Sequence, residues 1–166
     1  MTNPKFPGFE LLVEAQDRFR AELKTRAAVS CPCCNRTAKV YKRHITAPMA
    51  RFLLWLARHS KLNNVEWVHI DEIPQEIFLP ARGDYSKLAF WRLIENMPND
   101  RPETKNSGFW KLGPAAVPYL AGEPMPYTAF VLFGDCIGFS DDKTTISDAL
   151  DEEFDYAALM EYDFAA

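Results

Sequence analysis

The chain has 166 residues, of which 48% are hydrophobic and 13% aromatic, and its formal net charge is −4. The length supports one globular domain, or one domain with a small appendage, and the composition argues against a disordered chain. No run of about 18 apolar residues is present, as a membrane-spanning helix would need, and the first residues lack a signal-peptide pattern, so the sequence predicts a cytoplasmic protein with no membrane contact.

Charge is distributed unevenly along the chain. Residues 1–134 contain 18 Lys and Arg against 13 Asp and Glu, a net charge of +5, whereas residues 135–166 contain one Lys against ten acids, a net charge of −9. Between Glu22 and Glu66 there is no acid but nine Lys and Arg, which we call the basic window. Such a window favours phosphate, so we expect double-stranded DNA as a partner, with Lys42 and Arg43 among the contacts. A solvated charged face is the alternative.

The first predicted element is a helix over residues 9–28. Leu12, Ala15, Phe19 and Leu23 form an apolar stripe among alternating charges, which is typical of an amphipathic helix. Its apolar face would pack on the main body or on a second copy of the chain, so a homodimer is one expectation.

The next segment, Cys31-Pro32-Cys33-Cys34, precedes an alternating strand that runs to residue 45. The spacing of Cys31 and Cys34 resembles one knuckle of a zinc ribbon, but a closed structural zinc needs four ligands. The missing ligands would come from the same pair in a second chain or from the other soft side chains, namely Cys33, His44, His59, His69 and Cys136. A structural zinc at Cys31 and Cys34 is therefore one interpretation. A reduced structural turn is the other, and a thioredoxin-like redox motif is disfavoured because a strand follows the cysteines.

Residues 46–83 predict a helix, a short strand and a short helix. Thr46 precedes an apolar stretch with Pro48 in its first turn, which favours a helix over residues 47–60. Residues 65–70 alternate weakly and suit a strand. Asp71 then suits the start of a short helix that reaches Phe78.

Residues 82–112 predict a recognition helix followed by a wing. Asp84 can cap a helix over residues 85–97, in which Phe90, Leu93, Ile94 and Met97 recur at helical spacing before Pro98 ends it. Residues 98–107 are rich in turn formers, and an apolar strand returns at residues 108–112. A helix and hairpin in another mixed α/β domain is the alternative.

Residues 46–122 resemble winged-helix repressors of the multiple-antibiotic-resistance regulator type. The resemblance rests on residues 88–95, on the loop 99–107 and on Gly108-Phe109-Trp110-Lys111-Leu112-Gly113, although Gly113-Pro114-Ala115-Ala116 departs from the usual pattern after the strand. It implies a helix in the major groove and a loop on the phosphate backbone. The residues that it places at DNA are Tyr85, Ser86, Lys87 and Arg92 near the groove, with Arg101 and Lys105 on the wing. The whole chain also resembles small uncharacterised proteins of bacteriophages and bacterial genomes.

The C-terminal part predicts a β-hairpin and an acidic helix. Residues 128–133 and 136–140 are apolar segments around Gly134-Asp135, which indicates a tight turn between two strands. The spacing Thr145-x-x-Asp148 indicates the start of a helix. Aromatic residues then alternate with acids, so the tail is expected either to solubilise the chain or to bind a host protein through Asp151, Glu152, Glu153, Asp155, Tyr156 and Tyr162.

Together these patterns predict an α+β protein in three parts. Residues 1–45 would form the N-terminal helix and cysteine knuckle, residues 46–122 a winged helix-turn-helix core, and residues 123–166 the hairpin and acidic helix. The sequence contains no Gly-rich phosphate loop and no nucleophile motif, so we expect a non-enzyme that requires no cofactor. The favoured function is a DNA-binding regulator of phage or mobile-element type. The alternative is a phage inhibitor of a host nucleic-acid-binding or defence complex.

Overall fold

The computed structural model describes residues 11–26, 28–99 and 107–150. The described residues fall into two compact units, one within Met1–Lys42 and Phe130–Ile137 and the other within Arg43–Ala129 and Gly138–Ala166. Both helices and strands are present, which confirms the α+β class. None of the described helices combines the length and apolarity that a membrane crossing requires.

The first unit is built around one helix and a small hairpin. Helix α1 spans Leu12–Thr25, and strands β1 (Val29–Ser30) and β2 (Thr37–Ala38) pair antiparallel. The helix is shorter at both ends than predicted. Of its expected apolar stripe, Ala15 is buried whereas Leu12 is 58% exposed, so the stripe is only partly covered by the described residues of the chain.

The second unit is organised around α2, which spans Ala47–Asn63. The prediction for this helix is confirmed: Thr46 precedes it with extended backbone, Pro48 lies in its first turn, and Asn64 ends it in the left-handed conformation. Left-handed Asn is a common helix end because its short polar side chain tolerates that backbone. The helix carries most of the unit's buried side chains, including Met49, Phe52, Leu53, Leu54 and Leu56, and packs against α3 (Gln75–Ala81).

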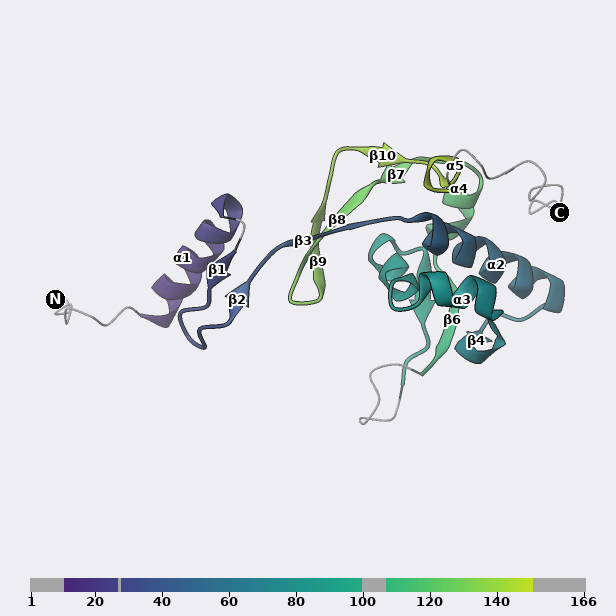
Figure 1. Ribbon diagram of the computed structural model, residues 1–166, viewed down its shortest axis with the longest axis horizontal. Coiled ribbons are helices and arrows are strands. Elements are labelled where there is room, and N and C mark those ends of the chain that lie inside the picture. The colour runs from purple at the N-terminus through teal and green to yellow at the C-terminus, as the bar shows by residue number, and fades with distance from the viewer. Residues whose placement is uncertain (1–10, 27, 100–106, 151–166) are drawn as a thin grey trace. The chain divides into compact units, whose positions relative to one another are not determined.

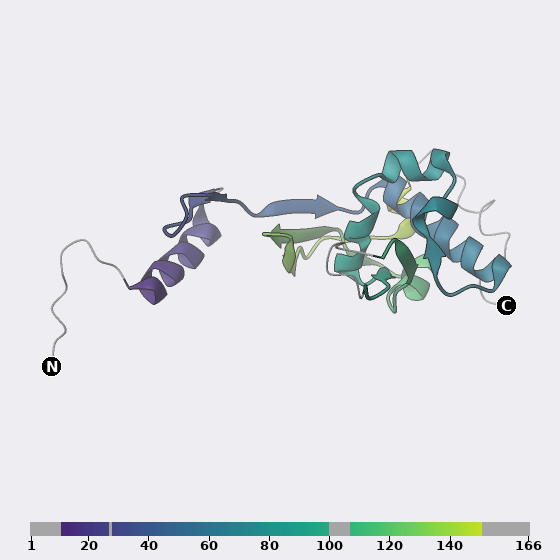
Figure 2. The ribbon, with the colours of Figure 1, turned by 90° about the horizontal axis from the view of Figure 1, so that it is seen from below.

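A three-stranded antiparallel sheet lies in the second unit. Its strands are β4 (Val68–His69), β5 (Ile94–Asn96) and β6 (Phe109–Leu112), in the order β4-β6-β5. In β6, Trp110 pairs with both Val68 and Asn96. The short 3₁₀ helix η1 (Ile70–Glu72) joins β4 to α3. Figure 1 shows β6 and α3 in the same lobe as α2, and the rotated view of Figure 2 shows α2 and α3 adjacent.

The predicted helix over residues 85–97 is wrong in type and length. Residues Tyr85–Trp91 form a 3₁₀ helix, η2, after which Arg92 turns left-handed and the chain enters β5. Tertiary pairing explains the change: Ile94 pairs with Leu112, and the backbone N–H of Gly113 donates to the Leu93 carbonyl oxygen at 2.9 Å. Leu93, just before β5, and Ile94, its first residue, are buried in this arrangement, so the helical spacing of these two residues reflects burial and does not correspond to a helix.

The remaining elements come from the C-terminal third and from one earlier strand. Helix α4 spans Ala116–Leu120, and β7 (Met125–Pro126) pairs with β10 (Lys143–Thr144). Strands β8 (Thr128–Leu132) and β9 (Asp135–Phe139) form the predicted hairpin, and with β3 (Tyr41–His44) they give a sheet of order β3-β8-β9. The turn is one residue earlier than predicted, with Phe133 and Gly134 at positive φ. Helix α5 (Ile146–Ala149) begins at Thr145 as predicted.

Candidate nucleic-acid interface and cysteine turn

A tight turn connects α3 to η2 in the second unit. Arg82, Gly83 and Asp84 make this turn, in which the Asp84 N–H donates to the Ala81 carbonyl at 2.9 Å and Gly83 adopts a φ of 80°. Glycine accepts that backbone without the steric cost that a side chain would meet. Helix α3 and the 3₁₀ helix η2 are thus joined by a three-residue turn.

Tyr85 begins η2 and packs inward rather than standing clear of the surface. Its ring centroid lies 5.0 Å from that of Phe52, 5.6 Å from that of Trp110 and 6.0 Å from that of Phe78. Burial raises the pKa of the Tyr85 hydroxyl, and the neighbouring Trp110 indole partly opposes that rise. Tyr85 therefore anchors η2 on α2 and β6. Its ring lies in an aromatic cluster, whereas it was expected to contact DNA.

The other predicted groove residues are spread around η2. Lys87 forms an ion pair with Asp84, three residues before it, and its side chain is 24% exposed. Ser86 is partly buried, whereas Arg92 is exposed in the left-handed position that ends η2.

The predicted wing corresponds to the connection between β5 and β6. Its base is closed by hydrogen bonds: the Met97 N–H and the Asn96 side-chain amide both donate to the Phe109 carbonyl oxygen at 3.0 Å, and the Ser107 hydroxyl donates to the Met97 carbonyl at 3.0 Å. Arg101 and Lys105 lie outside the described residues.

Residues of the basic window are distributed over several elements. Lys42 and Arg43 lie on β3, where Lys42 is exposed and Arg43 half-buried. On α2, the exposed cations are Arg51, Arg58 and Lys61. The basic window is therefore not a single helix face, and its Lys and Arg residues are divided between the two compact units.

One cation outside the window is held on the sheet. The ammonium of Lys111 on β6 lies 2.8 Å from the Glu66 carboxylate, 3.6 Å from that of Glu95 and 4.7 Å from the centroid of the Trp67 ring. The hydrogen bond to Glu66 is the main reason why the pKa of Lys111 is raised. Its charge is balanced locally, so Lys111 serves the packing of this face rather than phosphate.

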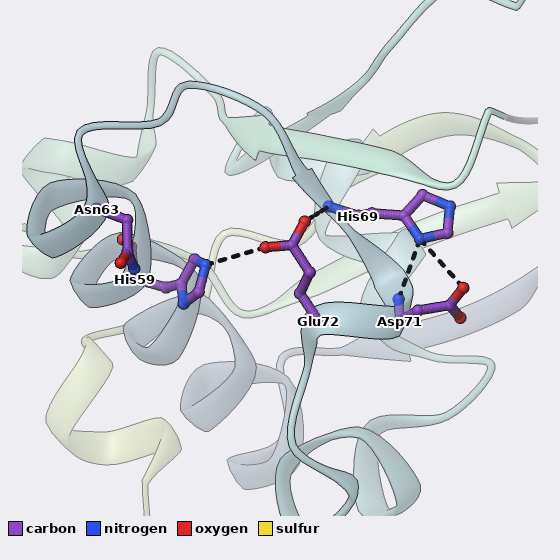
Figure 3. Close-up of polar contacts among 5 residues, drawn as sticks. All are labelled: His59, Asn63, His69, Asp71 and Glu72. Atoms are coloured by element: carbon purple, nitrogen blue, oxygen red, sulfur yellow. Dashed lines mark hydrogen bonds and ion pairs between the residues drawn. The ribbon is translucent and has the colours of Figure 1, made fainter.

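A polar cluster that the sequence did not reveal joins α2 to η1 (Figure 3). The Glu72 carboxylate lies between two histidines: one oxygen is 3.3 Å from His59 Nε2, and the other accepts the backbone N–H of His69 at 3.1 Å. His69 Nδ1 in turn accepts the N–H of Asp71 at 3.3 Å, and the His59 ring stacks on Trp55. The spacing His69-x-x-Glu72 is a capping pattern and was the available signal. Across the described ranges no set of three such side chains could hold a metal.

The cysteine turn between β1 and β2 has a defined geometry. The Cys31 N–H donates to the Arg36 carbonyl at 2.8 Å, and the Asn35 N–H donates to the Cys31 carbonyl at 2.9 Å, with Asn35 at a φ of 56°. Hydrogen bonds from the backbone amides of Cys33 and then Cys34 lower the pKa of the Cys31 thiol. Although Cys33 is exposed, desolvation of its sulfur, followed by repulsion from Cys31, raises its pKa. The turn thus favours the thiolate at Cys31.

The acidic residues proposed for protein binding, 151–162, lie outside the described residues. Comparison of the chain with protein-family models, with curated proteins and with solved structures finds no match. Any functional proposal must therefore rest on the topology and on the chemistry of individual residues, since a fold class alone does not imply a function.

Proposed function

We propose that residues 47–112 are a variant winged helix and that the chain binds duplex DNA through this unit. The observation that carries the proposal is the sheet order β4-β6-β5 combined with the element order α2, β4, α3, η2, β5, β6. A winged helix has this arrangement: a first strand pairs with the last strand of the wing hairpin, and a helix-turn-helix lies between them.

The element at the position of a recognition helix limits how this unit would read DNA. It is a seven-residue 3₁₀ helix whose Tyr85, Leu88 and Trp91 face the core. It therefore presents few side chains to base edges. We infer that binding depends mainly on phosphate contacts from exposed cations such as Arg92, with the wing residues Arg101 and Lys105 adding to them.

The direct experiment is binding of random duplex DNA across a salt series. The logarithm of affinity should fall linearly with the logarithm of salt concentration, with a steep slope if several phosphates are neutralised. The variants Arg92→Ala and Arg101→Ala/Lys105→Ala should each weaken binding and reduce the slope by about 1 for each phosphate contact removed.

Lys143→Ala is the matched control for these variants. Lys143 is an exposed cation on β10 within the acidic C-terminal third, so its loss should leave both affinity and slope unchanged. Absence of binding at low salt would contradict the proposal. So would equal losses in the Lys143 and Arg92 variants, because they would report overall charge only.

The charge of the C-terminus supports a second candidate, in which the chain binds a basic host protein. Residues 135–166 carry a net charge of −9, which complements a positively charged partner surface. Deletion of residues 151–166 separates the two candidates. Tighter DNA binding after deletion would mean that the tail competes with DNA, whereas loss of a host partner in pull-down with unchanged DNA affinity would favour the protein-binding function.

A further inference from the structure

We propose that the cysteine turn is half of a zinc site, which Cys31 and Cys34 of a second copy of the chain complete. One zinc ion would then join two chains through four thiolates. This inference is independent of DNA binding, because it concerns the first unit alone.

The first argument is the shape of the turn. Cys31 and Cys34 are the ends of a Cys-x-x-Cys turn between two paired strands, β1 and β2. The backbone hydrogen bonds of Cys31 and Asn35 close the turn, so the two sulfurs come from one short segment with a defined backbone.

The second argument is the count of ligands. Structural zinc is almost always held by four ligands in a tetrahedron, and the whole sequence contains four cysteines and three histidines. The three histidines already have partners in the second unit: His44 Nδ1 lies 3.0 Å from the Thr128 hydroxyl, His59 contacts Glu72, and His69 Nδ1 accepts from Asp71. Within residues 11–26, 28–99 and 107–150, no group of three ligating side chains is assembled.

The remaining cysteines are poorer candidates than a second Cys31 and Cys34 pair. Cys33 lies inside the turn between the two proposed ligands and is exposed. Cys136 is a single residue of β9 and already has a partner of its own. A second copy of the turn supplies two thiolates at the same spacing, so two-fold symmetry completes the tetrahedron with no new residue type.

A third observation favours a second copy of the chain at this unit. Leu11 directly precedes α1, and Leu12 and Val13 are its first two residues; these three side chains are 67%, 58% and 66% exposed. A contiguous exposed apolar segment marks an interaction surface more often than scattered apolar residues do. Burial of this segment between two copies would add an apolar contact to the metal link.

The experiment uses the full chain purified under reducing conditions, with elemental zinc and molar mass measured on the same sample. We expect about half a zinc per chain, since four thiolates would come from two chains, together with a dimer that a chelator converts to monomer. In the cobalt-substituted protein, thiolate-to-cobalt absorption should have the intensity of four thiolates.

Serine variants assign the ligands. Cys31→Ser and Cys34→Ser should each lose the metal and the dimer, whereas Cys33→Ser and Cys136→Ser should keep both. The cobalt spectrum of the wild-type chain tests the proposal independently if the Cys31 and Cys34 variants fail to fold. Absence of bound metal, one zinc per monomeric chain, or loss of the metal in Cys136→Ser would each overturn the shared site.

Discussion

The indole Nε1 of Trp91 donates a hydrogen bond of 2.7 Å to the carbonyl oxygen of Pro126. It links the last residue of η2 to β7, 35 positions later in the sequence. Trp91 is 5% exposed, and its ring also lies 6.1 Å from that of Phe139. The end of the 3₁₀ helix is therefore fixed to the C-terminal strands by one directional bond and by aromatic packing.

Replacement of Trp91 by Phe should lower the free energy of unfolding by more than about 1 kcal/mol, because a partly buried carbonyl loses its donor and some packing is lost. Urea unfolding at neutral pH measures this change. Val117→Ala on α4, where the side chain is 67% exposed, should change it by less than about 0.5 kcal/mol. If both variants lower the free energy of unfolding by the same amount, the hydrogen bond from Trp91 to Pro126 makes no specific contribution to stability.

Gly113→Ala should destabilise the protein by about 3 kcal/mol or more, because a Cβ at this position would collide with the Arg92 carbonyl, which is rigid backbone. Gly138 on β9 offers a matched control, since an added Cβ there meets nothing within 4 Å. Gly138→Ala should be neutral or stabilise by up to about 1 kcal/mol, because alanine loses less conformational entropy than glycine in a strand. Thermal unfolding of the two variants side by side tests this difference, and equal midpoints would contradict the close approach of the Arg92 carbonyl to Gly113.

Tyr85→Ala should destabilise by about 2 kcal/mol, below the range for a fully buried aromatic residue because Tyr85 is only partly buried. Tyr85→Phe should preserve folding because the ring contacts with Phe52 and Phe78 remain. If the hydroxyl holds a DNA phosphate, Tyr85→Phe will still weaken DNA binding. Unchanged affinity in the Phe variant would restrict Tyr85 to its packing role.

Tyr85 also predicts a dependence of stability on alkaline pH. Burial raises the pKa of its hydroxyl in the folded chain, so the unfolded chain releases this proton first as the pH rises. The contribution of Tyr85 is complete below the unfolded pKa of about 10 and is lost as the pH rises through the folded pKa. The decline of stability above that pH, followed by urea unfolding, should be shallower in Tyr85→Phe than in the wild type. If stability declines equally steeply with pH in both proteins, the Tyr85 hydroxyl is as solvated in the folded chain as in the unfolded chain.

Cys31 should react with iodoacetamide at lower pH than Cys33 in the metal-free, reduced chain. The thiolate is the reactive form, the amides of the turn lower the pKa of Cys31, and desolvation raises that of Cys33. Peptide mapping after brief labelling at several pH values measures the midpoint for each residue. A midpoint for Cys33 at or below that for Cys31 would contradict the amide contacts in the turn.

The sequence by itself determined the parts of the chain in which local rules decide the structure. Thr46 and Pro48 indicated the start of α2, Thr145-x-x-Asp148 the start of α5, and the two apolar segments around Gly134 the hairpin of β8 and β9. Capping and turn formation depend on residues within a few positions of one another, so they can be recognised without the fold. The spacing of Cys31 and Cys34 likewise indicated a turn followed by a strand, and the structure adds the short strand β1 before it.

Only the tertiary structure decided the segment after Asp84. Leu93 and Ile94 fit a helical stripe, but Ile94 begins β5, which pairs with β6, and the Leu93 carbonyl accepts the Gly113 N–H. Tertiary contacts of this kind outweigh helix propensity. The same holds for the contact of Glu72 with His59, which lies 13 positions earlier in the sequence. Such contacts arise from packing between elements, and single residues do not specify in advance which distant partner they will meet.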